Sequence, residues 1–307
     1  MSAVDWNLAE KVAVRAAGRE PFSESYHYES LARDFEELTA IAEGQVAEAT
    51  GLRSLTGNAR ARVTDRQGWV RANIASFQRL LRPITDRLDQ QIAANPFAPV
   101  ASRVAGAEVG VILGWMSGRV LGQYDLLVVE DENPDDQDIV YYVGPNVLGL
   151  EKRFGFPPRE FRHWLALHEV THRAQFTGIP WMREHFLGLV QSTVSSLDPD
   201  PKRLLDSLGR VATEVRSGRN PLDEGGLMAV FASPEQRAVL DQVSGLMSLL
   251  EGHGDVTMDR AGADQIPSAE RFGQVLRQRR AEARSAARLL QKLIGLEAKL
   301  KQYEQGE

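Results

Sequence analysis

One helical segment constrains the fold more than any other, because it combines a strongly apolar character with ionisable side chains. Residues 161–176 read FRHWLALHEVTHRAQF and contain three of the six histidines in this 307-residue chain. Apolar residues recur along the segment at the spacing of an α-helix, so we predict a helix over residues 160–176. Burying His168, Glu169 and His172 among these residues costs free energy unless a partner compensates them. The segment therefore favours a fold in which one helix carries a polar site into the core.

The sequence HEVTH at residues 168–172 supplies the chemistry of a metal site. Residues four positions apart project from one helix face, about 40° apart, so His168 and His172 can hold one zinc ion. Glu169 can then reach a water molecule on the open side of the ion and take its proton as a general base. We predict Zn²⁺ as the cofactor and Glu169 as the catalytic residue. Two other interpretations stay open: a buried helix whose histidines are satisfied by hydrogen bonds, and a metal site without catalysis.

A catalytic zinc ion needs a third protein ligand, which does not follow directly after His172. The chain there reads RAQFTG, which lacks the histidine of the H-x-x-G-x-x-H extension. The segment LLEGHGDVTMD at residues 249–259 places acidic and imidazole groups on a second strongly apolar helix. We predict Glu251 as the third ligand and keep His253 as the alternative, because a regular helix turns these two about 200° apart. Asp255, one turn after Glu251, is expected to accept the other ring N–H of a ligating histidine and fix its tautomer.

Glycine recurs at every fourth position in one apolar stretch. Each glycine inside a helix costs about 1 kcal/mol relative to alanine, so five of them predict that another backbone packs closely there. Gly252 and Gly254 carry the same expectation for packing against the catalytic helix. The five glycines of the strip are Gly106, Gly110, Gly114, Gly118 and Gly122.

Strand-like patterns are confined to one region. Alternating apolar residues at 124–130 and 138–145 predict an antiparallel hairpin around the acidic loop DENPDDQ. The other long segments have helical periodicity, so we predict an α+β fold that is predominantly helical, with a small antiparallel sheet. We expect an N-terminal helical region, residues 1–100, packed on a metal-binding unit, residues 101–307. That unit comprises the hairpin 124–145, the zinc helix 160–176, the third-ligand helix 234–260 and a C-terminal helix 268–303.

Composition excludes several classes of function. The chain has no cysteine, so a transition metal must be held by His, Asp or Glu. Its net charge of −6 gives no general attraction to nucleic acid or to an anionic membrane. The longest apolar run, residues 109–122, is too short to span a bilayer. The N-terminus has early acidic residues and no signal-peptide core, so we expect a cytoplasmic protein, of open oligomeric state.

Together, the motifs HEVTHRAQF, PWMREH and LLEGHGDVTMD, with the late GLEAKLKQYEQGE, resemble a zincin-like family of uncharacterised actinobacterial and related proteins. Some members carry labels that name a hydrolase or an association with deazaflavin-cofactor biosynthesis. The resemblance covers roughly residues 60–307 and implies a zincin fold, with a small sheet beside the H-E-x-x-H helix. The spacing of Glu251 and Asp255 also looks like that of glutamate-type zincins such as thermolysin. The final residues look like a sequence that continues in relatives, which implies a chain truncated at its C-terminus.

The resemblance also indicates where a substrate would bind. In zincins the strand before the metal helix usually lies along the cleft edge and pairs with extended substrate, which assigns that place to residues 138–143. Tyr141 and Tyr142 then point to opposite faces, where one could line the cleft or donate a hydroxyl to the oxyanion; packing within the sheet is the other interpretation. His185 is a further oxyanion candidate. His163 lies on another helix face from the motif histidines and is expected to be a packing or capping residue.

These observations predict a zinc-dependent hydrolase, specifically a metallopeptidase in which a metal-activated water attacks a peptide bond. The expected partner is a peptide or a small amide, with no nucleic acid and no membrane. A non-catalytic, metal-binding helical scaffold or interaction protein is the first alternative, favoured by the charged C-terminal helix and the glycine strip. An amidohydrolase acting on a small metabolite is the second.

Overall fold

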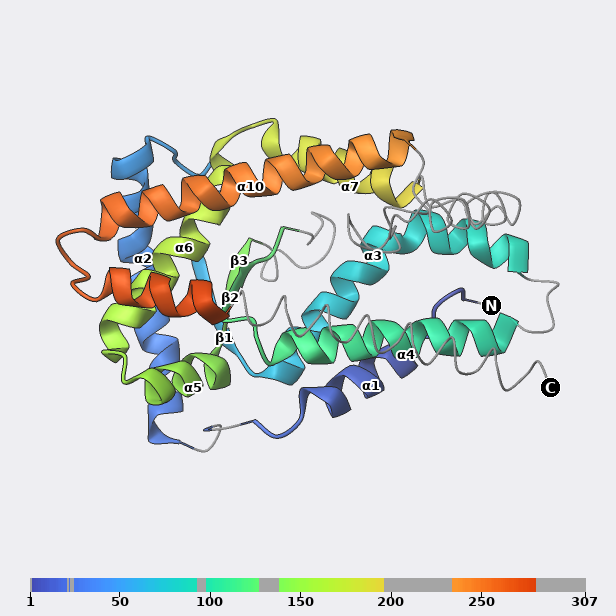
Figure 1. Ribbon diagram of the computed structural model, residues 1–307, viewed down its shortest axis with the longest axis horizontal. Helices are drawn as coiled ribbons and strands as arrows, with labels where there is room; N and C mark the ends of the chain where they lie inside the picture. Colours follow the sequence, from blue (N-terminus) through green and yellow to red (C-terminus); the bar gives the residue numbers. More distant parts are fainter. Residues whose placement is uncertain are drawn as a thin grey trace, which may run out of the picture.

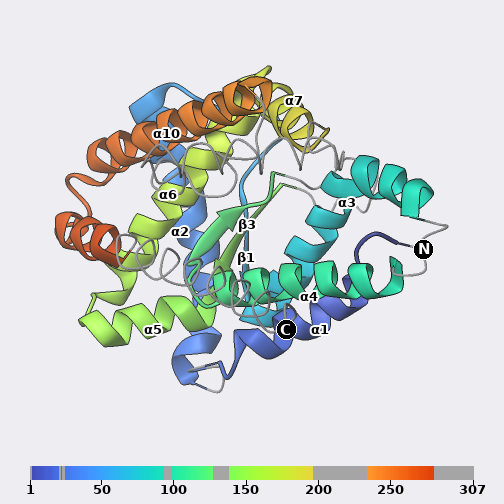
Figure 2. The ribbon, with the colours of Figure 1, turned by 45° about the vertical axis from the view of Figure 1, so that its right-hand side comes forward.

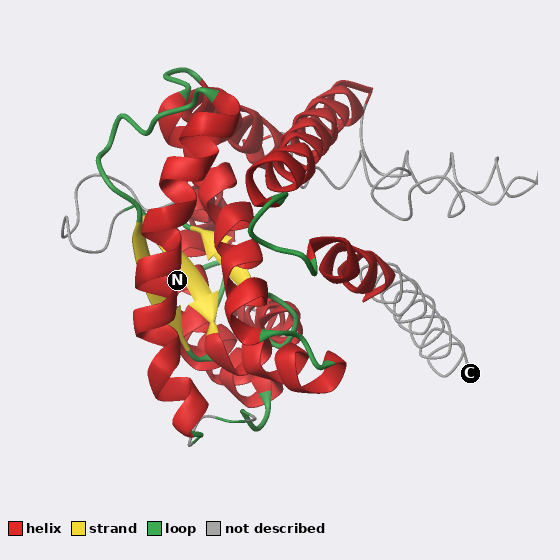
Figure 3. Ribbon diagram, turned by 90° about the vertical axis from the view of Figure 1, so that its left-hand side faces the viewer, coloured by secondary structure: helices red, strands yellow, loops and turns green. Residues whose placement is uncertain are grey.

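The computed structural model describes residues 2–20, 22, 25–92, 98–126, 138–195 and 234–279, and in these parts helices surround a small three-stranded sheet (Figures 1 and 3). The first half contains α1 (Trp6–Ala17), α2 (Tyr26–Thr50), α3 (Arg66–Ile92) and α4 (Ala98–Ser117). The second half contains α5 (Gly144–Phe154), α6 (Pro158–Gly178), α7 (Met182–Ser195) and α10 (Pro234–Gly262). A further helical stretch at 269–279 follows α10 and is called the C-terminal helix below. The predominantly helical α+β prediction is confirmed.

The sheet has one strand more than the predicted hairpin. Its order is β1-β3-β2, from β1 (Arg60–Thr64), β2 (Gly122–Tyr124) and β3 (Ile139–Val143). Strand β3 pairs antiparallel with β2, as expected, but also parallel with β1, so the sheet is mixed. Strand β1 was not predicted, because this short strand, RARVT, carries two exposed arginines and little apolar signal. Strand β2 starts two residues earlier than predicted, and the acidic loop lies outside the described residues.

Helix α6 packs against helices on two sides and against the sheet. It contacts α2, α10 and strands β2 and β3, and Figure 2 shows it between α2 and α10. Pro158 sits at the first helical turn, where its missing N–H is not needed, and Pro180 follows shortly after the helix ends. Most α6 side chains are buried, polar ones included, so each buried polar group requires a defined partner.

One apolar face of α2, formed by six residues at helical spacing, is the partner surface for α6. Five of its six positions are fully buried, whereas Ile41 is 37% exposed. Phe35 stacks on Tyr142 of the central strand at a ring-centroid distance of 3.8 Å, which joins α2 to the sheet. The buried positions are Leu31, Phe35, Leu38, Ala42 and Val46.

The glycine strip packs on α1, as predicted for a close backbone approach. A Cβ on Gly106 would lie 2.3 Å from the carbonyl oxygen of Asp5, and a Cβ on Gly110 would lie 2.6 Å from that of Ala9. Gly114 meets Ala13 and Ala16 in the same way. The two helices lie side by side in Figure 1. The strip ends there, because Gly118 has only the Arg66 side chain at ordinary contact distance and Gly122 belongs to β2.

Of the predicted C-terminal helix 268–303, residues 280–303 lie outside the described part of the chain. Within the described residues, no helix combines the length and the apolar character needed to cross a membrane. The division of the chain at residue 100 stays a prediction.

Candidate metal centre

Helix α6 brings the two motif histidines together through its own geometry. The Nε2 atoms of His168 and His172 are 3.2 Å apart, and the two rings are nearly perpendicular, at 85°. Trp164, one turn earlier, stacks parallel to the His168 ring at 6.3 Å between centroids. The two imidazoles therefore direct one nitrogen each towards a common point.

Glu251 reaches that point from α10. Its Oε1 lies 3.6 Å from Nε2 of His172, and one ligand atom from each of the three residues lies within 4.8 Å of the others. Ligand atoms about 2.0–2.1 Å from a tetrahedral zinc ion are about 3.3–3.4 Å apart, so the donor set fits such an ion in number, chemistry and spacing. The Glu251 side chain is 41% exposed, which leaves solvent access on this side.

The backbone of α10 approaches both histidines at one glycine only. A Cβ on Gly254 would lie 3.7 Å from Cε1 of His172 and 4.0 Å from Nδ1 of His168, which is ordinary contact. Gly252 has open space around it, so the prediction of close packing is wrong for this residue.

Gln175 connects the two helices beneath the candidate ligands. Its Oε1 lies 3.0 Å from Nδ1 of His172, and an amide oxygen can only accept, so this nitrogen carries the proton. Nε2 of His172 is then left as a lone-pair donor for a metal ion. The Gln175 amide nitrogen donates to the carbonyl of Leu250 and to Nδ1 of His253, both at 2.9 Å. His253, the alternative third ligand, thus contacts Gln175, which in turn contacts His172.

Glu169 lies against the edge of the sheet. Its side chain is buried, and a Cβ on Gly122 of β2 would come within 2.6 Å of its Cγ and Oε1. Only glycine leaves room for the carboxylate at this point of the strand. The glycine that the sequence analysis placed in a helical strip therefore shapes the site from the sheet.

The sequence matches a family described as zincin-like metallopeptidase over residues 4–307. The chain belongs to this family. This match extends the predicted resemblance towards the N-terminus, while the actinobacterial and deazaflavin associations stay predictions. The family implies a divalent metal ion, usually zinc.

One solved structure shares the fold of this zincin-like chain. It is described as "a putative hydrolase with a novel fold from Chloroflexus aurantiacus", with a TM-score of 0.65 and 28% sequence identity. The likeness covers 90% of this chain and 75% of that one. No curated protein matches the sequence.

The two tyrosines of the zincin-like chain lie in the interior of its sheet. Tyr142 is fully buried, and its hydroxyl is 2.8 Å from that of Thr39. Burial raises the pKa of Tyr142 well above its usual value, and the charge of Glu169 raises it further. Tyr141 is 8% exposed, and its ring lies under the guanidinium of Arg62 at 5.9 Å. Tyr142 is therefore a packing residue of the sheet, and its hydroxyl contacts Thr39 of α2.

The strand predicted to line the cleft is the central one. Both edges of β3 are occupied, by β1 and by β2, so β3 has no free edge for an extended substrate. The assignment of residues 138–143 to the cleft edge is wrong for this reason. The outer strand next to the candidate centre is β2, whose Gly122 contacts Glu169.

Three further predicted residues lie apart from the converging atoms. Asp255 is exposed, and Gln175 rather than an aspartate contacts Nδ1 of His172. His185 is exposed on α7, where its ring meets Trp181 edge to face. His163 is buried and lies 2.7 Å from Oε1 of a glutamine on α2, which agrees with the packing role expected for it.

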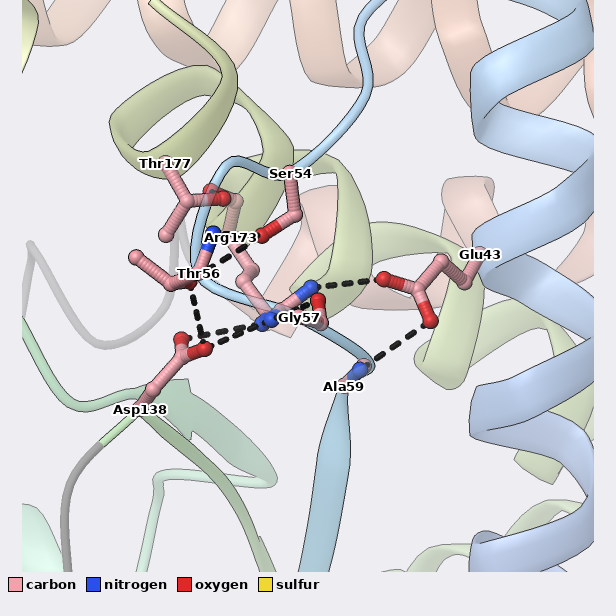
Figure 4. A network of polar contacts seen from close by, with 8 residues as sticks. All are labelled: Glu43, Ser54, Thr56, Gly57, Ala59, Asp138, Arg173 and Thr177. Atoms are coloured by element: carbon pink, nitrogen blue, oxygen red, sulfur yellow. Dashed lines mark hydrogen bonds and ion pairs between the residues drawn. The ribbon is translucent and has the colours of Figure 1, made fainter. Parts of the chain in front are cut away.

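Arg173, the residue after His172, anchors α6 through a network of polar contacts (Figure 4). Its buried guanidinium donates to both carboxylate oxygens of Asp138, at 2.9 and 2.6 Å, and to Glu43 at 2.7 Å. It also donates to the carbonyl of Gly57, and Glu43 accepts from the backbone N–H of Ala59. This network ties α6 to α2, to the loop before β1 and to the start of β3.

Neither Gln175 nor Arg173 was predicted from the sequence. The available signal was their chemical type, since an amide and a guanidinium on a mostly buried helix require partners. Their positions three residues and one residue after His172 place them on different faces, one towards α10 and one towards α2.

Proposed function

We propose that this protein is a zinc-dependent peptidase that hydrolyses an amide bond at the centre formed by His168, His172 and Glu251. The observation that supports it is the convergence of these three side chains from two helices, although Glu251 lies more than seventy positions after His172. A buried helix with satisfied histidines would not require a carboxylate from α10 at 3.6 Å.

Glu169 and Gln175 have separate roles in the proposed reaction. When bound, a zinc ion supplies Lewis acidity, which polarises a carbonyl and makes water acidic enough to be deprotonated near neutral pH. Glu169 follows His168 directly, and its side chain lies against Gly122 of β2. Its carboxylate can therefore take the proton of the attacking water. The same carboxylate then delivers the proton to the leaving amine. Gln175 holds His172 in the tautomer that offers Nε2.

The arrangement of β2 supports a peptide as the substrate. Strand β2 pairs with β3 through one edge and stands at the end of the described sheet. An extended peptide can add to such an edge through backbone hydrogen bonds, the mode known as β-augmentation. A peptide aligned there would run past Gly122 and hence past the Glu169 carboxylate.

The test combines metal analysis with hydrolysis of a broad peptide library by the full chain. Wild type should contain one zinc ion per chain and cleave a subset of peptides. Glu169→Gln should retain the metal and lose about 10²- to 10⁴-fold in turnover, because the general base is removed while the ligands remain. Glu184→Gln, which neutralises an exposed glutamate of α7, is the matched control and should leave turnover unchanged.

Two outcomes contradict the proposal. Full activity of Glu169→Gln would remove this residue from catalysis. A metal-bound wild type that cleaves no peptide would favour the scaffold or the small-amide alternative. The cytoplasmic location remains a prediction that this experiment does not address.

A further inference from the structure

Three arginines from separate parts of the chain lie where the C-terminal helix passes the end of α4, and a fourth, Arg153, is close enough to act electrostatically on one of them, Arg279. Arg66 opens α3, Arg119 follows α4, Arg153 lies in the last turn of α5, and Arg279 lies in the C-terminal helix. Arg279 Nη1 is 3.4 Å from the backbone oxygen of Arg119, and the Arg66 guanidinium lies beside Gly118. Figure 1 shows the end of the C-terminal helix beside the end of α4. We call these four residues the arginine cluster.

Two members of the cluster are held in place by neutral groups. The guanidinium of Arg119 lies 4.0 Å from the ring centroid of Trp115 and donates to the Trp115 carbonyl at 2.9 Å. Arg66 donates to Oδ1 of Asn146 at 2.8 Å and to the carbonyl of Ala17 at 3.2 Å. These contacts orient the guanidinium groups but do not neutralise them, so the positive charge of the cluster persists.

The charge of the cluster is poorly compensated by the described part of the chain. Within the described residues, Glu20 lies beside the cluster and accepts from the backbone N–H groups of Arg66 and Gln67, and Asp65 directly precedes Arg66. Two carboxylates do not balance four arginines. Arginine does not lose its proton in proteins, so the repulsion cannot be relieved by deprotonation. The chain as a whole carries a net charge of −6, so this concentration of positive charge is a local feature.

Electrostatics around Arg279 agree with this geometry. Burial lowers the pKa of Arg279, and the charges of Arg119, Arg153 and Arg66 lower it further. Burial also lowers the pKa of Arg119. An anion bound among these groups would remove the repulsion, and a partly desolvated setting strengthens the attraction.

We propose that the arginine cluster is a binding site for a phosphate group. Planar guanidinium groups donate pairs of parallel hydrogen bonds that match phosphate and carboxylate oxygens. A phosphate carries nearly two negative charges near neutral pH and offers several acceptor oxygens, so it compensates four cations better than one carboxylate does. The phosphate could come from a free anion or from a phosphorylated peptide, and the experiment separates these two sources.

The test measures binding to the full-length, metal-loaded chain by calorimetry, at an ionic strength held constant with sodium chloride. The ligands are inorganic phosphate and a phosphoserine peptide, with the unphosphorylated peptide as its control. Arg119→Gln and Arg153→Gln, both at exposed residues, should each weaken phosphate binding by about tenfold or more, because each removes a charged donor. Arg279→Gln should do the same.

Arg277→Gln is the matched control. It removes the same charge from the same helix, two residues earlier, where the side chain folds back over Gly273. Retained phosphate binding in Arg277→Gln, with loss in the cluster variants, supports the proposal. Equal loss in all variants would indicate a non-specific charge effect and overturn it, as would unchanged binding in the cluster variants or no binding by wild type at millimolar phosphate. Tighter binding of the phosphopeptide than of inorganic phosphate would identify the peptide as the source, and the reverse would identify the free anion.

Discussion

Replacing Gly122 with alanine should disable catalysis while leaving the metal in place. The added Cβ would lie 2.6 Å from Cγ and 2.7 Å from Cδ of Glu169. Non-bonded carbons pack at about 3.5 Å or more, so the Glu169 side chain must move by about 0.9 Å. A displacement of about 1 Å in a catalytic group costs on the order of 10²-fold in rate. This loss corresponds to about 2.7 kcal/mol of activation free energy.

The assay follows kcat and KM for a peptide that wild type cleaves, together with zinc content and the free energy of unfolding. Gly122→Ala should lower kcat and retain one zinc ion, because the candidate ligands belong to α6 and α10. Overpacking against the buried Glu169 side chain should also destabilise the fold by about 1–3 kcal/mol. Gly118→Ala is the control, since its Cβ would meet only Arg66, at 3.9 Å, and should leave kcat unchanged.

Two results would refute this reasoning. A Gly122→Ala enzyme with the kcat of wild type would show that β2 does not position Glu169. Loss of zinc from a folded variant would show that the alanine disturbs the ligands, and that the glutamate is not the group displaced.

Three other perturbations test the surroundings of the centre. Gln175→Leu removes the acceptor from Nδ1 of His172 and should lower zinc affinity about 10- to 100-fold, measured by competition with a chromophoric chelator; unchanged affinity would exclude a positioning role. Arg173→Met leaves its partly buried carboxylate partners without a cation and should lower the free energy of unfolding by about 1–3 kcal/mol in urea titrations, whereas an unchanged stability would mean that the network relaxes. Burial, together with a nearby arginine, lowers the pKa of His163 below its ordinary value, so the folded state favours the neutral ring. Stability from this group is complete above about pH 6.5 and is lost as the pH falls, so His163→Gln should flatten the loss of unfolding free energy between about pH 7.5 and 5.5, and an unchanged slope would contradict this.

The candidate ligands on α6 could be predicted because their relation is local. A four-residue spacing on a helix determines that His168 and His172 share a face, whatever surrounds them. The choice of Glu251 rested on the cost of a carboxylate on an apolar helix, and the geometry of the described residues brings this carboxylate to His172. Asp255, chosen by the same helical logic, is exposed instead.

The strand order of the sheet could not be predicted from local patterns in the sequence. Strand β3 was predicted from its apolar residues, but its neighbours depend on β1, which lies about eighty residues earlier and has little apolar signal. Placing β1 beside β3 makes β3 central and moves the open edge to β2. The same change turns Gly122 from a member of a helical strip into the residue that contacts Glu169.

The amino-acid sequence by itself determined the helical framework, the paired imidazoles and the need for partners of buried polar groups, since each follows from periodicity within one segment. Only the tertiary structure decided which groups meet. Gln175 of α6 contacts Leu250 and His253 of α10, β2 rather than β3 forms the edge beside Glu169, and arginines from distant parts of the chain lie near one another. These contacts join residues far apart in the chain, and helical or strand periodicity does not specify how separate elements pack.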